Sequence, residues 1–165
     1  MRIVKTLTLL AAFAAGCVQA APSKKCLSLP ASWGRDVEIV EALRAYTGAD
    51  GESHIEKIAL PGKQGSYYGG SVKLTQFDFG DPSRVVLVYG HPNMNIAAHP
   101  APYREIFIVL SGSSEIHLAN GEVHALSPGS MVITEDLGSK GRSGRSGPCG
   151  YVALDIQFKT ETTVK

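Results

Sequence analysis

Short β-rich segments separated by turn residues constrain this chain most. Six runs rich in β-branched and aromatic residues are bounded by Gly, Pro, Asn or Asp, and they are residues 72–79, 85–89, 105–110, 115–118, 131–134 and 151–158. Asn120-Gly121 separates two further alternating segments and predicts a tight hairpin. The 18 glycines and 9 prolines supply the turns that such a fold needs. The pattern predicts an all-β barrel or sandwich.

One segment before these runs has a helical spacing. Asp36 is a suitable N-cap, and Gly48 can end a helix. Between them the apolar residues recur every third position, at Val37, Val40, Leu43 and Tyr46. The spacing predicts one short N-terminal helix, within an extension that covers residues 21–45. The barrel is then expected over 46–158, followed by a frayed polar tail at 159–165.

The first twenty residues have the pattern of a secretory signal peptide. Arg2 and Lys5 precede a short apolar run, and small residues lead to cleavage after Ala20. The alternative is a lipoprotein box ending at Cys17, in which case the protein is anchored to a membrane. Either route predicts a secreted or periplasmic protein. In that oxidising compartment, the two remaining cysteines, Cys26 and Cys149, are expected to form a disulfide, the alternative being two free thiols.

The charge of the chain excludes a large class of partners. The formal net charge is +1, and loss of Arg2 and Lys5 with the leader leaves 14 basic against 15 acidic side chains. No nucleic-acid partner is therefore expected. The residues at 106–110 are apolar at every position, so both faces of that strand need cover. A second layer or a second subunit, in a homodimer, can supply it.

The segment from His99 to Arg142 resembles a small single-domain cupin. Glu105 is followed by six residues and Gly112, as in the first cupin motif, and His99 stands at the place of that motif's first histidine. The chain departs from the motif at Ala101, where the second histidine belongs, and at Asn93, where its opening glycine belongs. The second cupin motif has a proline, a glycine and a histidine where this chain has Glu135, Leu137 and Lys140, so it departs from that motif as well.

A bacterial group within the cupins is a closer match. The chain is similar to it at His99-Pro100-Ala101-Pro102, at Pro128-Gly129 and at Glu135-Asp136 followed by Gly138-Ser139-Lys140-Gly141. Arg142 stands where the loop of that group usually ends in histidine. The resemblance covers roughly residues 46–158 and implies a jelly-roll-like β-barrel of the RmlC-like cupin superfamily. It implies no single activity.

The ligand set that the cupin resemblance implies for a metal is incomplete. Such a site typically uses three histidines and one glutamate to hold Fe, Mn, Ni or Zn. The chain supplies His99 and Glu105, with His91 as a substitute from another strand. Arg142 can replace the missing histidine and neutralise Glu105 directly, since a guanidinium pairs well with a carboxylate. That hypothesis predicts a site without a complete metal centre.

Several further residues are candidates to contact a small molecule at the barrel mouth. Asp136 ends a strand, and the segment 138–148 is expected to be a basic, glycine-rich lid that can hold an anion. Tyr103 shares a face with Glu105 and can pack or act as a general acid. The predicted ligand-binding set is His91, His99, Tyr103, Glu105, Asp136, Lys140 and Arg142.

Three functions are compatible with this sequence. The first is a secreted cupin that binds a small polar or anionic organic molecule. The second is a cupin enzyme, an isomerase, lyase or dioxygenase, that uses His99, Tyr103 and Glu105 with or without a metal. The third is a dimeric structural protein of the envelope. No serine elbow, CxxC, HExxH or dinucleotide motif is present to support nucleophilic, dithiol or nucleotide chemistry.

Overall fold

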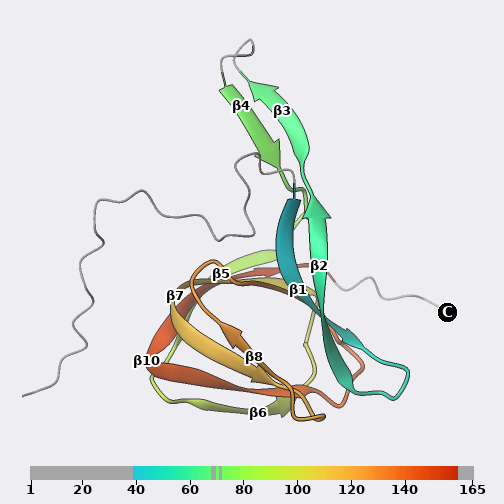
Figure 1. The fold of residues 1–165 in the computed structure, drawn as a ribbon, viewed down its shortest axis with the longest axis vertical. Helices are drawn as coiled ribbons and strands as arrows, with labels where there is room; N and C mark the ends of the chain where they lie inside the picture. The colour runs from blue at the N-terminus through green and yellow to red at the C-terminus, as the bar shows by residue number, and fades with distance from the viewer. Residues whose placement is uncertain (1–38, 68–69, 71, 160–165) are drawn as a thin grey trace, which may run out of the picture.

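The computed structural model describes residues 39–67, 70 and 72–159, and nearly all of them form or connect β-strands (Figure 1). The strands of this part of the chain are β1 (Ile39–Thr47), β2 (Ser53–Pro61), β3 (Lys63–Tyr67), β4 (Val72–Gln76), β5 (Arg84–Gly90), β6 (Asn95–His99), β7 (Glu105–His117), β8 (Val123–Leu126), β9 (Met131–Glu135) and β10 (Arg142–Gln157). The expected all-β class is confirmed.

Two long strands organise the barrel. β7 and β10 pair antiparallel along both of their halves, with a register shift between the pairs Ser146–Ser114 and Tyr151–Gly112. The order of the main sheet is β2-β1-β9-β7-β10-β5, while β6 pairs with the first half of β10 and β8 with the second half of β7. Figure 1 shows β7 and β10 curving so that β6 and β8 lie across from β5. The sheet thereby folds around an interior, as the cupin resemblance implies.

The predicted N-terminal helix is wrong, because its described residues, from Ile39 on, form strand β1. β1 pairs antiparallel with β2 over its whole length and parallel with β9 from Leu43 to Tyr46. Burial along it alternates at first, with Val40 and Ala42 buried around an exposed Glu41. Pairing on both edges satisfies the backbone and outweighs the three-residue spacing of apolar side chains. The sheet therefore includes residues that were expected in the N-terminal extension.

The expected basic lid is also much shorter than predicted. β10 begins at Arg142, so the glycine-rich residues 142–150 are strand, and the loop between β9 and β10 covers only residues 136–141. These glycines lie against another part of the same chain. A Cβ on Gly147 would approach Ser113, and a Cβ on Gly144 would approach the backbone of Glu115. Glycine here permits close strand contact instead of forming a lid.

The predicted hairpin at Asn120-Gly121 is confirmed. β8 pairs with the end of β7 from Ser114–Leu126 to His117–Val123, and the turn between them contains Gly121 with a φ of 88°. Two predicted strands, 105–110 and 115–118, belong to the single strand β7, since the segment between them continues the same ladder to β10. The β3–β4 hairpin forms a separate two-stranded sheet that projects from the barrel (Figure 1).

β7 separates two apolar clusters. Its Val109 packs with Ile116, Leu118, Leu126 and Val132, whereas its Ile106 packs on the other side with Ala42, Ile133 and Phe158. The expectation that this strand is covered on both faces holds for Ile106 and Val109, which are almost fully buried, but Leu110 is 50% exposed.

The outer face of β5 exposes large apolar side chains. Val85, Leu87 and Tyr89 alternate along the strand and are each more than half exposed. The described residues place no second layer over them, and the homodimer stays a prediction. Cys149 lies exposed in β10, while Cys17 and Cys26 fall outside the described residues, as do the leader and its cleavage site. The disulfide and the lipid anchor therefore remain predictions. Among the described residues, no helix has the length and apolar character needed to cross a membrane.

Candidate functional site

A cavity of about 170 Å³ opens into the barrel between β6, β7, β9 and β10. Much of its wall is apolar, formed by Ile96, Phe107, Ile116, Leu126 and Val132. Polar or ionisable side chains also line it, namely His99, Glu105, Ser114, Glu115, Thr134, Arg142, Ser143 and Tyr151. An apolar hollow with a few convergent polar groups is the usual form of a small-molecule site.

The register of the sheet gathers the polar groups. Glu105 of β7 lies opposite Thr134 of β9 on one side and Gln157 of β10 on the other. Directly opposed residues of neighbouring strands point to the same face of a sheet. Two residues back along β10, Asp155 occupies the next row on that face. The strands thus place a row of polar side chains at one end of the apolar interior.

The carboxyl group of Glu105 has an unusual titration. Burial and the negative charge of Asp155 raise the pKa of Glu105 to about 7 from its ordinary value of 4.5. The neighbouring Thr134 hydroxyl and the positive charge of Arg142 act in the opposite direction, but they are the weaker influences. Near neutral pH the site therefore holds a carboxyl group that can be protonated or ionised.

Two buried oxygens beside Glu105 lack ordinary hydrogen-bond partners. Within the described part of the chain, Thr134 Oγ1 and Asp155 Oδ1 are buried and make no hydrogen bond of normal geometry. The other oxygen of Asp155 accepts a hydrogen bond from Gln157 Nε2 at 2.7 Å. Thr134 is 1% exposed and lines the cavity. A buried polar atom without a partner costs free energy, so such atoms commonly mark places where a ligand or water binds.

Arg142 is bound to Asp136 and not to Glu105, so the predicted direct pairing with Glu105 is wrong. Arg142 Nη1 lies 2.7 Å from Asp136 Oδ1 and 2.6 Å from Oδ2. Both side chains are buried, with Asp136 fully so. Asp136 directly follows β9, and its carboxylate lies between Ser53 at the start of β2 and Arg142 at the start of β10. Arg142 still lines the cavity, but its charge is already matched.

A network of hydrogen bonds, here called the clasp, holds Asp136 in place. The clasp joins the β1–β2 turn, residues 48–52, and Ser53 at the start of β2 to the loop of residues 136–141. Ser53 Oγ donates to Asp136 Oδ2 at 2.7 Å and lies at the same distance from Ser139 Oγ, and the Lys140 amide donates to the Gly51 carbonyl. These bonds hold the Asp136–Arg142 pair at the wall of the cavity.

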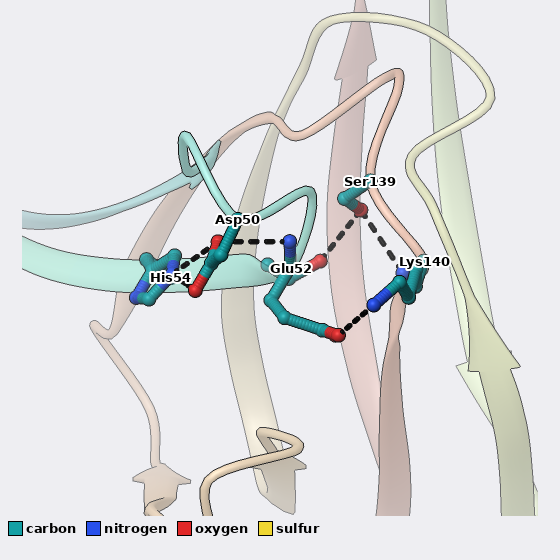
Figure 2. A network of polar contacts seen from close by, with 7 residues as sticks. Asp50, Glu52, His54, Ser139 and Lys140 are labelled. Carbon is teal, nitrogen blue, oxygen red and sulfur yellow. Dashed lines mark hydrogen bonds and ion pairs between the residues drawn. The ribbon is translucent and has the colours of Figure 1, made fainter.

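The outer part of the clasp is exposed and charged (Figure 2). Lys140 Nζ contacts the Glu52 carboxylate at 2.5 Å, and His54 Nε2 lies 3.0 Å from both oxygens of Asp50. The Glu52 carboxylate and the Asp50 carboxylate raise the pKa of Lys140. Lys140 is therefore held on the surface by Glu52 and does not line the barrel cavity.

The structure brings together part of the predicted ligand-binding set. His99, Glu105 and Arg142 line the cavity, and Asp136 contacts Arg142. His99 Nδ1 lies 2.8 Å from the Ala97 carbonyl, which assigns the proton to Nδ1 and leaves Nε2 available.

The other predicted residues lie elsewhere. His91, Tyr103 and Lys140 are not part of the cavity wall. The ring of His91 packs edge-on against Tyr89, with centroids 5.1 Å apart.

The donor set does not fit the metal that the cupin resemblance implies. Among the described residues, no group of three or more His, Cys, Asp or Glu side chains is placed to share an ion. At the two remaining ligand places the chain has Ala101, which is buried, and either Lys140 or Arg142, cationic side chains that have no acceptor to offer a metal ion. His99 and Glu105 alone are two ligands, fewer than a transition-metal site requires.

Thr134, Tyr151 and Asp155 belong to the site but were not predicted from the sequence. Tyr151 forms an edge-to-face contact with Phe107, with centroids 5.7 Å apart, and burial raises the pKa of its phenol. A signal for Asp155 existed in the sequence. Asp155 and Gln157 alternate with Leu154 and Ile156, so one face of an otherwise apolar strand is polar.

Comparison with known proteins adds no named activity. No protein-family model matches the chain, and no curated protein matches it. A solved structure of a conserved protein of unknown function from Streptococcus pyogenes is similar over 47% of this chain and 65% of that chain, with 17% identity and a TM-score of 0.38. An uncharacterised conserved protein with a double-stranded β-helix domain from Klebsiella pneumoniae is similar over 49% of this chain and 79% of that chain, with 26% identity and a TM-score of 0.35.

Proposed function

We propose that this protein binds a small polar organic molecule in the cavity of its barrel. The observation that carries the proposal is the buried hydroxyl of Thr134, which lies beside Glu105 in the cavity wall and makes no hydrogen bond of normal geometry. A ligand group placed there gains a hydrogen bond that the protein alone does not make. The apolar side chains of the wall contact the remainder of the ligand.

The size of the cavity limits the ligand. A protein cavity of about 150 Å³ accommodates benzene, and this cavity measures about 170 Å³. The part of the ligand inside the cavity is therefore at most a single ring or a short hydrocarbon with one polar group. Larger sugars or nucleotides exceed this volume unless most of the molecule lies outside.

The charge of the site supports a polar ligand more than an anionic one. Arg142, the cation at the wall, already binds the Asp136 carboxylate. Lys140, also expected to attract an anion, binds Glu52 on the surface. Neither cation is left without a counter-charge for an incoming carboxylate or phosphate.

The proposal is tested by mapping the binding site of small ring compounds in solution. Amide chemical-shift changes in the full chain are expected to concentrate at cavity residues such as His99, Thr134 and Tyr151. The variant Ile116→Phe fills the cavity and should abolish these changes, while the matched control Val123→Phe, at a position 54% exposed, should preserve them. Shift changes confined to the outer surface, or equal in both variants, would overturn the proposal.

A second candidate function is acid–base catalysis on the bound molecule. The observation in its favour is the pKa of Glu105, about 7, in a cavity that also contains His99. A carboxyl group that titrates near neutral pH can give and take protons efficiently. In deuterated water, wild-type protein should speed hydrogen exchange at an acidic carbon of a bound ligand. Equal exchange with Glu105→Gln would exclude this function.

The signal-peptide pattern further supports a proposal that the protein acts outside the cytoplasm. Cell fractionation of the natural host is expected to place the mature protein, lacking residues 1–20, in the periplasm or medium. Recovery of the uncleaved chain in the cytoplasm would contradict it, and recovery in the membrane with a lipid on Cys17 would select the lipoprotein route.

A further inference from the structure

The charges inside the barrel do not balance. Arg142 and Asp136 form one buried pair, which is neutral as a unit. Glu105 and Asp155 remain beside each other on the inner face of β7 and β10, and among the described residues no cation lies within ion-pair distance of either. Burying carboxylates without a counter-charge is costly, so this arrangement favours the arrival of positive charge.

The groups around Glu105 come from each strand that packs against it. β9 contributes Thr134, β10 contributes Asp155 and Arg142, and β6 contributes His99 on the cavity wall. Arg142 is the one permanent cation in this set, and it forms an ion pair with Asp136. The net charge around Glu105 is therefore negative whenever Glu105 is ionised.

Both unpartnered atoms at this end can accept hydrogen bonds, and the Thr134 hydroxyl can also donate one. Asp155 Oδ1 is an acceptor when ionised, and Thr134 Oγ1 can accept with either of its lone pairs. With the Glu105 carboxylate they offer acceptors for a group that carries several N–H donors. A primary ammonium has three such donors and a positive charge, whereas a carboxylate or phosphate has acceptors alone.

Aromatic rings lie next to this polar end. Phe107 and Tyr151 form an edge-to-face pair in the cavity wall. Ring faces attract cations and pack well against a flat apolar body. The cavity volume of about 170 Å³ fits a body the size of one benzene ring.

We infer that the natural ligand is a small primary amine with an aromatic or short apolar body. Its ammonium group binds Glu105 and Thr134, with Asp155 behind them, and its body lies among Phe107, Tyr151 and Val132. This inference rests on the proposed function, since it names the ligand class of the same cavity.

Three molecules of nearly equal size test the inference. Benzylamine, benzyl alcohol and benzoate share a ring and differ in carrying a cation, a neutral hydroxyl or an anion. Titration calorimetry of the full-length mature protein at pH 8 should show benzylamine binding at least tenfold more tightly than benzyl alcohol, with benzoate the weakest. Benzoate or benzyl alcohol binding as tightly as benzylamine would overturn the inference, yet leave the proposed function in place. Failure of all three to bind would overturn both.

Variants of the polar end separate charge from shape. Glu105→Gln keeps the size of the side chain and should reduce the affinity for benzylamine at least tenfold, with little effect on benzyl alcohol. Thr134→Val is a second, nearly isosteric variant and should weaken benzylamine several-fold. Glu122→Gln, at an exposed carboxylate of the β7–β8 turn, is the matched control and should bind as wild type does.

Two results with these variants would contradict the inference. The first is an unchanged affinity for benzylamine in both Glu105→Gln and Thr134→Val. The second is displacement of benzylamine by Zn²⁺ or Mn²⁺ alone, which would show that the carboxylates of the cavity bind a metal ion and not an ammonium group.

Discussion

Arg142 Nη1 lies 2.7 Å and 2.6 Å from the two carboxylate oxygens of Asp136, and both side chains are buried. This pair leaves Glu105 without a cation at ion-pair distance among the described residues. Burial and the charge of Asp155 raise the pKa of Glu105, and the opposing influence of Arg142 is weaker. Ser53 and Ser139, from the clasp, hold the pair in place.

Removing Asp136 should strongly destabilise the fold. Asp136→Ala leaves Arg142 as an unpaired buried cation, and breaking a buried pair in this way costs about 3–5 kcal/mol. Urea unfolding should show that loss relative to wild type. Glu122→Ala, at an exposed carboxylate, should change the unfolding free energy by less than about 0.5 kcal/mol. Equal stability of the two variants would show that the buried pair has no role in the fold.

Glu105 should make the protein less stable as the pH rises from 4.5 to 7. The folded pKa, about 7, lies above the ordinary value of 4.5, so in this range the folded state binds more protons than the unfolded state. The expected loss is on the order of 2 kcal/mol, fully reached above pH 7.

The variant Glu105→Gln isolates this contribution. Thermal unfolding of both proteins between pH 4 and pH 8 should show that the wild type loses stability relative to Glu105→Gln as the pH rises. Parallel curves across that range would mean that Glu105 titrates normally and is not buried against Asp155.

Gly141 should be essential to the shape of the cavity. Its φ is +96°, and a Cβ there would lie 2.3 Å from the carbonyl carbon of His99. Gly141→Ala must therefore push β6 away from β10, which moves His99 from the wall. We expect a loss of at least about 2 kcal/mol, together with weaker ligand binding.

Gly121→Ala is the control for Gly141. Gly121 also has a positive φ, of +88°, but nothing lies within 4 Å of a Cβ at that position. This variant should show backbone strain alone, about 1 kcal/mol, with ligand binding unchanged. Equal effects of the two substitutions on binding would contradict the role given to the close contact with His99.

The fold class was predictable from the sequence because its signals are local. Runs of β-branched residues bounded by turn residues, and the Asn120-Gly121 hairpin, need no knowledge of distant partners. The conformation of residues 39–46 was predicted wrongly because it depends on pairing with β2 and with β9, and β9 lies far along the chain. Strand pairing of that kind overrides a short helical spacing.

Two residues of the site were predictable from the sequence, but the pairing of its side chains was not. His99 and Glu105 followed from the cupin resemblance, and both line the cavity. The partner of Arg142 did not follow, because it depends on which carboxylate the turn of residues 136–141 brings within reach. Thr134 and Asp155 become informative once the register places them beside Glu105. No local pattern reveals that their oxygens lack hydrogen-bond partners.

The most direct test of the account is a high-resolution crystal structure of the mature protein with benzylamine. The account predicts electron density for the ring between Phe107, Tyr151 and Val132, with the amine nitrogen within hydrogen-bond distance of Thr134 Oγ1 and the Glu105 carboxylate. Ordered water alone in the cavity, with benzylamine absent or bound only on the outer surface, would contradict it.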